Sequence, residues 1–180
     1  PAMALLEAIR SDANPVVAEG AVGRWSAMYN ILSDQKQKAK FSELVRNAWL
    51  GRLQQLGFNP QSGEGLADSS LRAELVGALG MMGDPTVAAQ ARTRFAALAA
   101  DPRALDGPLK TTWLNIAARN ATAAEWDLLA QLARSSKSAV EQQAYYAQLG
   151  RVADKTLAQR ALDLALTGEA GTSSAAIITA

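Results

Sequence analysis

Hydrophobic residues recur every three or four positions along most of the chain, and short polar or glycine-containing segments separate these stretches. This spacing places the apolar side chains on one face of an α-helix. The longest stretch begins after Ser33 or Asp34, either of which can cap a helix N-terminus. It ends at Gly57, which can close a helix in the left-handed conformation. The pattern therefore predicts one long helix between these residues.

Further stretches with the same spacing predict additional helices. They lie at residues 69–82, 85–99, 108–119, 122–134, 138–150 and 154–166. Some helix starts are marked by an Asn or Asp cap followed by proline at the first helical position, namely Asn14-Pro15, Asp84-Pro85 and Asp101-Pro102. Residues 58–68 are rich in turn-forming residues and are expected to form a loop.

The amino-acid composition favours helix over strand. The chain of 180 residues contains 38 alanines and 23 leucines against 13 valines and isoleucines together. Unbranched side chains lose little rotamer freedom in a helix, whereas β-branched residues favour strands. The composition and the periodicity together predict an all-α fold.

An internal repeat suggests how the helices are arranged. Residues 79–91 and 149–161 are identical at six of thirteen positions, which are Leu79/Leu149, Gly80/Gly150, Asp84/Asp154, Thr86/Thr156, Ala88/Ala158 and Ala91/Ala161. A more degenerate copy at 116–129 reduces the period to roughly 35 residues, one helical hairpin. This period is typical of α-α superhelices, HEAT-like or armadillo-like solenoids of antiparallel hairpins, in which small residues allow close helix approach at the turns. Chance similarity between alanine-rich helices is the alternative.

The chain contains no histidine and no cysteine. Their absence excludes ordinary zinc and copper sites, Ser-His-Asp and Cys-His nucleophile systems, and disulfides. The carboxylates Asp84, Asp101 and Asp154 stand at helix caps, while Glu125 and Asp127 are about 200° apart around one helix and cannot converge. The sequence therefore predicts no catalytic residue and no metal ligand in this chain.

Other binding functions find little support in the residues. The Gly63-Glu64-Gly65 segment lacks the spacing and lysine of a phosphate-binding loop. The formal net charge of +1 disfavours nucleic-acid binding, so the lysines at 36, 38 and 40 are interpreted as a solvated helix face. The tryptophans, at positions 25, 49, 113 and 126, are expected in the core. The longest apolar run, 95–100, is too short to cross a membrane, and the compartment stays open between cytoplasm and periplasm.

Several short segments occur in an order that resembles one known family. They are Leu-Gly-Phe at 56–58, Ser-Gly-Glu-Gly at 62–65, Leu-Arg at 71–72, Leu-Gly at 79–80, Glu-Trp-Asp at 125–127 and Leu-Gly-Arg at 149–151. Over residues 5–166 the chain resembles the C-terminal helical domain of zinc aminopeptidases of the puromycin-sensitive and endoplasmic-reticulum aminopeptidase type. In that family a long helix ends in a Leu-Gly-aromatic turn, and a Gly-Glu loop and a helix with Leu-Arg follow.

The resemblance implies a parent peptidase that removes amino-terminal residues from peptides. Its catalytic domain would hold one zinc ion on His-Glu-x-x-His and a distant glutamate, and none of these motifs occurs in this chain. This chain would be a noncatalytic domain, without a cofactor of its own, that packs on the catalytic domain of the same parent and encloses the peptide-substrate cavity. Glu64 and Arg72 are carried over as candidate cavity-lining or interdomain residues; alternatively, they hold loop and helix together by local hydrogen bonds.

The resemblance also has an implication for the two ends of the chain. Domains of that family are longer at both ends, so residues 1–180 are interpreted as a single solenoid-domain fragment truncated at both ends. Exposed hairpin faces would then lead the fragment to self-associate, and a monodisperse monomer at high concentration would contradict this. The alternative function is a stand-alone α-solenoid scaffold that binds a protein partner.

Overall fold

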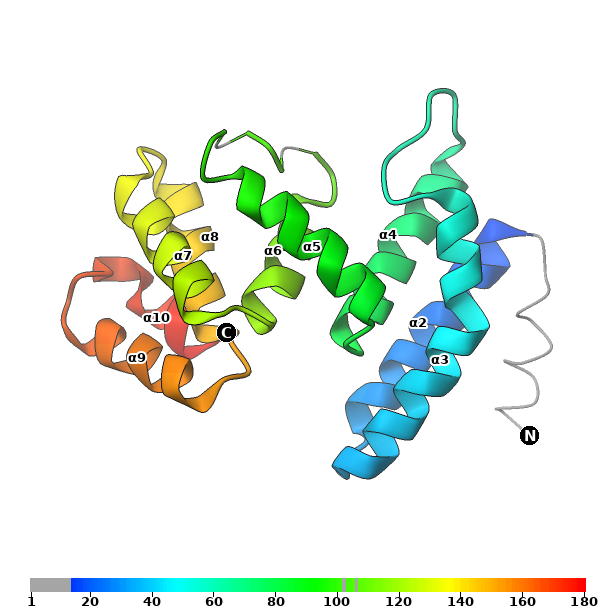
Figure 1. Ribbon diagram of the computed structural model, residues 1–180, viewed down its shortest axis with the longest axis horizontal. Helices are drawn as coiled ribbons and strands as arrows, with labels where there is room; N and C mark the ends of the chain where they lie inside the picture. Colours follow the sequence, from blue (N-terminus) through cyan, green and yellow to red (C-terminus); the bar gives the residue numbers. More distant parts are fainter. Residues whose placement is uncertain (1–13, 102, 106) are drawn as a thin grey trace. The chain divides into compact units, whose positions relative to one another are not determined.

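The computed structural model describes residues 14–101, 103–105 and 107–180, and every regular element in these residues is helical (Figure 1). The elements are α2 (Pro15–Ile31), α3 (Gln35–Leu56), α4 (Leu66–Met81), α5 (Pro85–Ala97), α6 (Lys110–Arg119), α7 (Ala123–Ser135), α8 (Ala139–Gly150), α9 (Lys155–Leu166), a short 3-10 helix (Gly171–Ser173) and α10 (Ser174–Ile178). The predicted all-α fold is confirmed.

Most helices begin at the capping residues that the sequence indicated. Asn14 accepts a hydrogen bond from the backbone N–H of Val16 at 3.0 Å, and Asp34 accepts one from Gln37 at 2.8 Å. The other side-chain caps are Asp84, Thr122, Ser138 and Asp154. The long helix α3 ends at Gly57, as predicted, and the φ of Gly57 is positive at 72°. Its ψ of 166° lies outside the left-handed helical conformation that was expected.

The predicted helix start at Asp101 is wrong. The carboxylate of Asp101 accepts the backbone N–H of Arg103 at 2.9 Å, and its carbonyl oxygen accepts that of Ala104 at 2.9 Å. Such an Asx-type turn uses the same hydrogen bonds as a helix cap but does not continue into a helix. The chain runs through further turns, including Gly107 at φ 142°, and α6 begins only at Lys110; Pro102 lies outside the described residues.

One helix start comes earlier than predicted, and one helix was not predicted. Helix α4 begins at Leu66, not at residue 69, because its cap is Gly65, which has no side chain to mark it. The apolar C-terminal run contains the short α10, whose Ile177 is buried. The carbonyl oxygen of Ile177 would lie 2.1 Å from a Cβ added to Gly150. The backbone of α10 therefore lies directly against Gly150 of α8.

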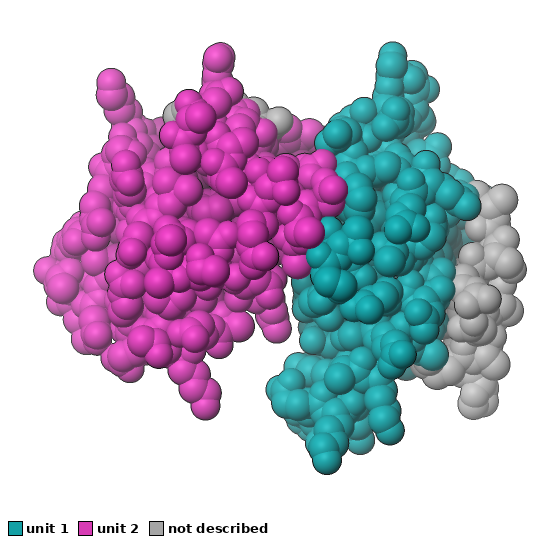
Figure 2. Space-filling model, viewed as in Figure 1, with its two compact units in different colours: residues 1–87 teal, residues 88–180 magenta. Residues whose placement is uncertain are grey.

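The chain divides into two compact units, residues 1–87 and residues 88–180, shown in teal and magenta in Figure 2. In unit 1, α4 packs against both α2 and α3. Apolar side chains from all three helices form its core: Trp25, Val45, Trp49, Leu53, Leu71 and Leu75 are at most 1% exposed. Trp25 also contacts Phe41, with ring centroids 5.5 Å apart.

Unit 2 has its own core. Helix α7 packs against α8, and α10 packs against α8 and α9. The side chains of Leu129, Tyr146, Leu149 and Ala161 are almost fully buried between these helices. Each unit therefore buries apolar surface within itself, as a stable compact segment must.

The two copies of the sequence repeat have the same local structure. In each, a helix ends in a short turn and an aspartate caps the next helix. Asp84 Oδ1 accepts the N–H groups of residues 86 and 87, both at 2.9 Å, and Asp154 Oδ1 accepts those of residues 156 and 157 at 2.9 and 3.0 Å. The residues that precede the turns, Leu79 and Leu149, are both buried. The similarity therefore reflects a repeated helix-turn-helix junction.

The tryptophans pack in the cores, as predicted, since Trp25, Trp49, Trp113 and Trp126 are at most 4% exposed. Among the described helices, none combines the length and the apolar character needed to cross a bilayer.

Candidate functional site

The structure brings together the two residues that the sequence singled out. Arg72 projects from α4 toward the C-terminal end of α3 and is only 1% exposed. Its Nε donates to the carbonyl oxygen of Gly57 at 2.9 Å, and its Nη2 donates to that of Leu56 at 3.1 Å. These carbonyl groups lie at the end of α3, where the helix itself offers no partner. Arg72 thus donates hydrogen bonds to carbonyl groups at the C-terminus of α3 that have no partner within that helix.

The same guanidinium binds the carboxylate of Glu64 through both terminal nitrogens. Glu64 stands in the loop between α3 and α4, and its Oε2 also accepts the backbone N–H of Gln61 at 3.0 Å. The hydrogen bonds from Arg72 and from Gln61 lower the pKa of Glu64 to about 2. Glu64 is therefore ionised at neutral pH and fixes the loop to α4.

This arrangement is the one expected if Glu64 and Arg72 hold the loop and the helix together by local hydrogen bonds. A two-pronged arginine–carboxylate pair combined with backbone acceptors gives a rigid connection between helix ends. The guanidinium is buried and its partners lie within unit 1. The role of Glu64 and Arg72 as cavity-lining or interdomain contacts stays a prediction.

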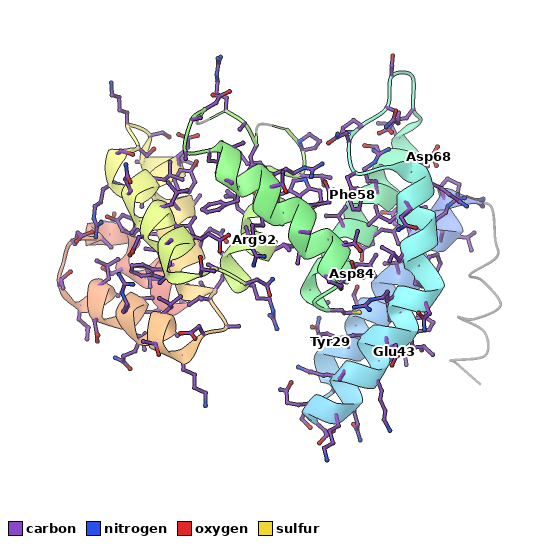
Figure 3. All side chains as sticks on the ribbon, in the orientation of Figure 1. Tyr29, Glu43, Phe58, Asp68, Asp84 and Arg92 are labelled. Atoms are coloured by element: carbon purple, nitrogen blue, oxygen red, sulfur yellow. The ribbon has the colours of Figure 1, made fainter. Side chains whose placement is uncertain are left out.

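A second buried charge lies at the turn between α4 and α5 (Figure 3). Asp84 is 3% exposed, and one carboxylate oxygen caps α5. The other oxygen, Oδ2, lies 2.9 Å from Nε of Arg46 on α3, close enough for an ion pair although the N–H does not point at the oxygen. The sequence predicted the Asp84 cap but not the contact with Arg46. The position of Arg46 opposite Asp84 depends on how α3 packs.

Polar side chains also lie between α2 and α4, and the sequence did not predict them. Ser70 donates its hydroxyl hydrogen to Glu19 at 2.8 Å, and a Cβ on Gly23 would lie 3.6 Å from Oε1 of Glu74. Burial raises the pKa of Glu74, and the negative charge of Glu19 raises it further. The charge of Glu19 thus acts on Glu74 from a neighbouring helix, and no sequence motif marks such a pair.

The described residues do not bring together the side chains that a metal centre would need. The chain has no histidine and no cysteine, and the described residues contain no group of three or more acidic side chains placed to hold a metal ion. The lysines of α3 behave largely as a solvated face: Lys36 and Lys40 are exposed, while the ammonium of Lys38 lies 5.1 Å from the ring centroid of Tyr29.

The described part of the chain is thus an all-helical protein segment with repeated helix-turn-helix junctions, a largely buried Glu64–Arg72 ion pair, and a buried Asp84 paired with the partly exposed Arg46. Over residues 1–180 the sequence matches the family described as the ERAP1-like C-terminal domain. The chain belongs to this family and is a C-terminal domain of an aminopeptidase-type protein. No curated protein sequence matches it.

Proposed function

We propose that the chain is the noncatalytic C-terminal domain of a zinc metallo-aminopeptidase, a parent enzyme that removes amino-terminal residues from peptides. The observation that carries this proposal is the family match over the whole chain. In this role the domain packs on the catalytic domain of the same parent chain and encloses the cavity in which the peptide substrate binds.

The zinc ion of such an enzyme belongs to the catalytic domain. The residues of this chain do not fit a zinc site, because zinc in proteins is bound mainly by histidine, cysteine and convergent carboxylates. Histidine and cysteine are missing here. The domain contributes shape and substrate access, and any chemistry takes place elsewhere in the parent.

The helical hairpins suit an enclosing role. The equivalent turns at Asp84 and Asp154, together with the sequence period, support a HEAT-like solenoid in which each hairpin packs on its neighbours. Solenoids of this kind form extended concave surfaces, which can limit the length of peptide that reaches an active site. On this proposal the ionic connections at Arg72 and Asp84 keep the helices in a fixed arrangement.

The reading frame that precedes residue 1 provides the most direct test. We expect it to encode a His-Glu-x-x-His helix within a few hundred residues, and its absence would refute the peptidase assignment. At the protein level, the 180-residue chain with added zinc should not hydrolyse aminoacyl-coumarin substrates. The parent from which this domain is deleted should keep its zinc but lose its dependence on peptide length.

The alternative is a stand-alone α-solenoid scaffold that binds a protein partner. Two units with separate cores, as observed here, are compatible with a helical protein that needs no catalytic neighbour. The same reading frame separates the two functions, because a scaffold would have no upstream metallopeptidase sequence. Self-association of the chain through exposed hairpin faces at its ends stays a prediction.

A further inference from the structure

Residues 168–180, the strap, follow α9 and fold back onto the other helices of unit 2 (Figure 1). The strap contains two glycines with positive φ, Gly168 at 77° and Gly171 at 53°, a conformation that other residues rarely adopt. The 3-10 helix and α10 belong to the strap, and α10 packs against α8 and α9. The strap is thus a short cover on unit 2 that is connected to α9 through a glycine-containing bend.

Few side chains attach the strap to unit 2. Ile177 is 2% exposed, whereas its neighbour Ile178 is 60% exposed. Glu169 lies 2.6 Å from Arg134 on α7, but the two side chains are 38% and 51% exposed, and exposed ion pairs contribute little to stability. The other buried residues of the strap are small, namely Ala170 and Ser173. Ile177 is therefore the main anchor.

Helix α10 is too short to be stable without this packing. It contains five residues, whereas an isolated helix of fewer than about 12 residues is marginal in water. Its hydrogen bonds, such as the one from the N–H of Thr179 to the carbonyl oxygen of Ala175, therefore depend on contact with α8 and α9. Because Ile177 is the one large side chain that the strap buries, its release should free the strap as a whole.

The helices next to the strap are joined by contacts of their own. Helix α7 packs closely on α8. Leu129 and Ala133 on α7 are at most 1% exposed, and Nε1 of Trp126 on α7 donates to the carbonyl oxygen of Leu149 on α8 at 3.3 Å. The packing of α7 on α8 and this hydrogen bond do not involve residues of the strap, so they can persist when the strap is released.

We propose that the strap is a lid that opens as one unit while the rest of unit 2 stays folded, and that its opening uncovers the surface of α8 beside Gly150. In the closed state the backbone of α10 covers this surface, since a Cβ on Gly150 would lie 2.1 Å from the carbonyl oxygen of Ile177. Segments with few buried apolar contacts open at a lower free-energy cost than the whole fold. This inference does not rest on the proposed function.

Amide hydrogen exchange of the 180-residue chain, followed by NMR, tests the opening. The N–H groups of Ser173 and Thr179 donate to carbonyl oxygens within the strap, and the N–H of Leu129 lies within α7. We expect Ser173 and Thr179 to share one protection factor, at least about tenfold lower than that of Leu129. Protection equal to that of Leu129, protection that falls steadily along the strap as in fraying, or no protection at all would overturn the proposal.

Two neighbouring isoleucines test whether Ile177 is the anchor. Ile177→Ala removes the buried side chain and should speed the exchange of Ser173 and Thr179 by at least about tenfold, without changing that of Leu129. Ile178→Ala is the matched control, because this side chain is exposed, and it should change the exchange of the strap by less than about threefold. Equal effects of the two variants, or an equal increase at Leu129, would overturn the proposal.

Discussion

The carbonyl oxygen of Ile177 occupies the space that a Cβ atom on Gly150 would take, with only 2.1 Å between the two positions. Gly150→Ala should therefore force α10 away from α8 and lower the free energy of unfolding by about 1–3 kcal/mol, the usual cost of overpacking. Chemical denaturation of the two proteins, followed by circular dichroism, measures the difference.

Gly51→Ala is the matched control for this substitution. Gly51 lies inside α3, and a Cβ there would meet nothing within 4 Å. Because alanine favours the helix over glycine, this variant should be more stable by about 0.5–1 kcal/mol. If Gly150→Ala were also stabilising, the close approach of α8 and α10 would be refuted.

Replacement of Arg72 by alanine should destabilise unit 1. The variant removes the side-chain donor of the Leu56 and Gly57 carbonyl groups and leaves the Glu64 carboxylate with the backbone N–H of Gln61 but without its ionic partner. Removal of one partner from a buried network costs about 2–5 kcal/mol. Arg72→Lys should recover only part of this, since lysine lacks the planar fork, and Arg103→Ala, at a side chain 85% exposed, should change little. Urea titration gives these free energies.

The pH dependence of stability should reveal Glu64. Its pKa is about 2 in the folded chain against an ordinary value of 4.5, so ionised Glu64 favours the folded state. That contribution is fully present above pH 4.5 and is lost as the pH falls from 4.5 toward 2. Glu64→Gln should lower stability at pH 7 and remove this part of the acid slope. An unchanged slope in the variant would show that Glu64 does not bind Arg72 in solution.

Periodicity and caps were enough to predict most helices, because these signals are local. Asp34 and Gly57 stand at the two ends of α3 as the pattern indicated. Two errors arose where the local signal was ambiguous or missing. Asp101 makes the hydrogen bonds of a cap in a turn that does not continue into a helix, and Gly65 caps α4 without a side chain.

The candidate contacts were harder to predict, because they depend on packing between distant segments. Glu64 and Arg72 are eight residues apart, and their pairing follows from one loop. By contrast, Arg46 meets Asp84 across α3 and the turn before α5, and Arg160 meets Trp126 across two hairpins. A single sequence carries no signal for such pairs, since charged residues at these spacings are common on solvated helices.

The two equivalent caps allow the contribution of Arg46 to be measured. Asp154→Ala removes only an exposed N-cap and should cost about 1 kcal/mol. Asp84→Ala removes the same cap together with a buried charge paired to Arg46, and should cost about 2–4 kcal/mol. Equal losses in the two variants, measured by thermal denaturation, would indicate that the ion pair does not stabilise the turn.

Glu74 should respond to pH in the opposite sense to Glu64. Burial beside α2 and the charge of Glu19 raise the pKa of Glu74 above its ordinary 4.5, so ionisation of Glu74 disfavours the folded state at neutral pH. The wild-type chain should gain stability from this group as the pH falls through the raised pKa. Glu74→Gln should therefore be more stable than wild type at pH 7, and this advantage should vanish below pH 4.5. Glu43→Gln, at an exposed position on α3, is the control and should show no such difference.

Urea titrations at pH 7 and below pH 4.5 measure the free energies of unfolding of the variants and the wild type. A Glu74→Gln variant less stable than wild type at pH 7 would mean that the Glu74 carboxylate has a stabilising partner.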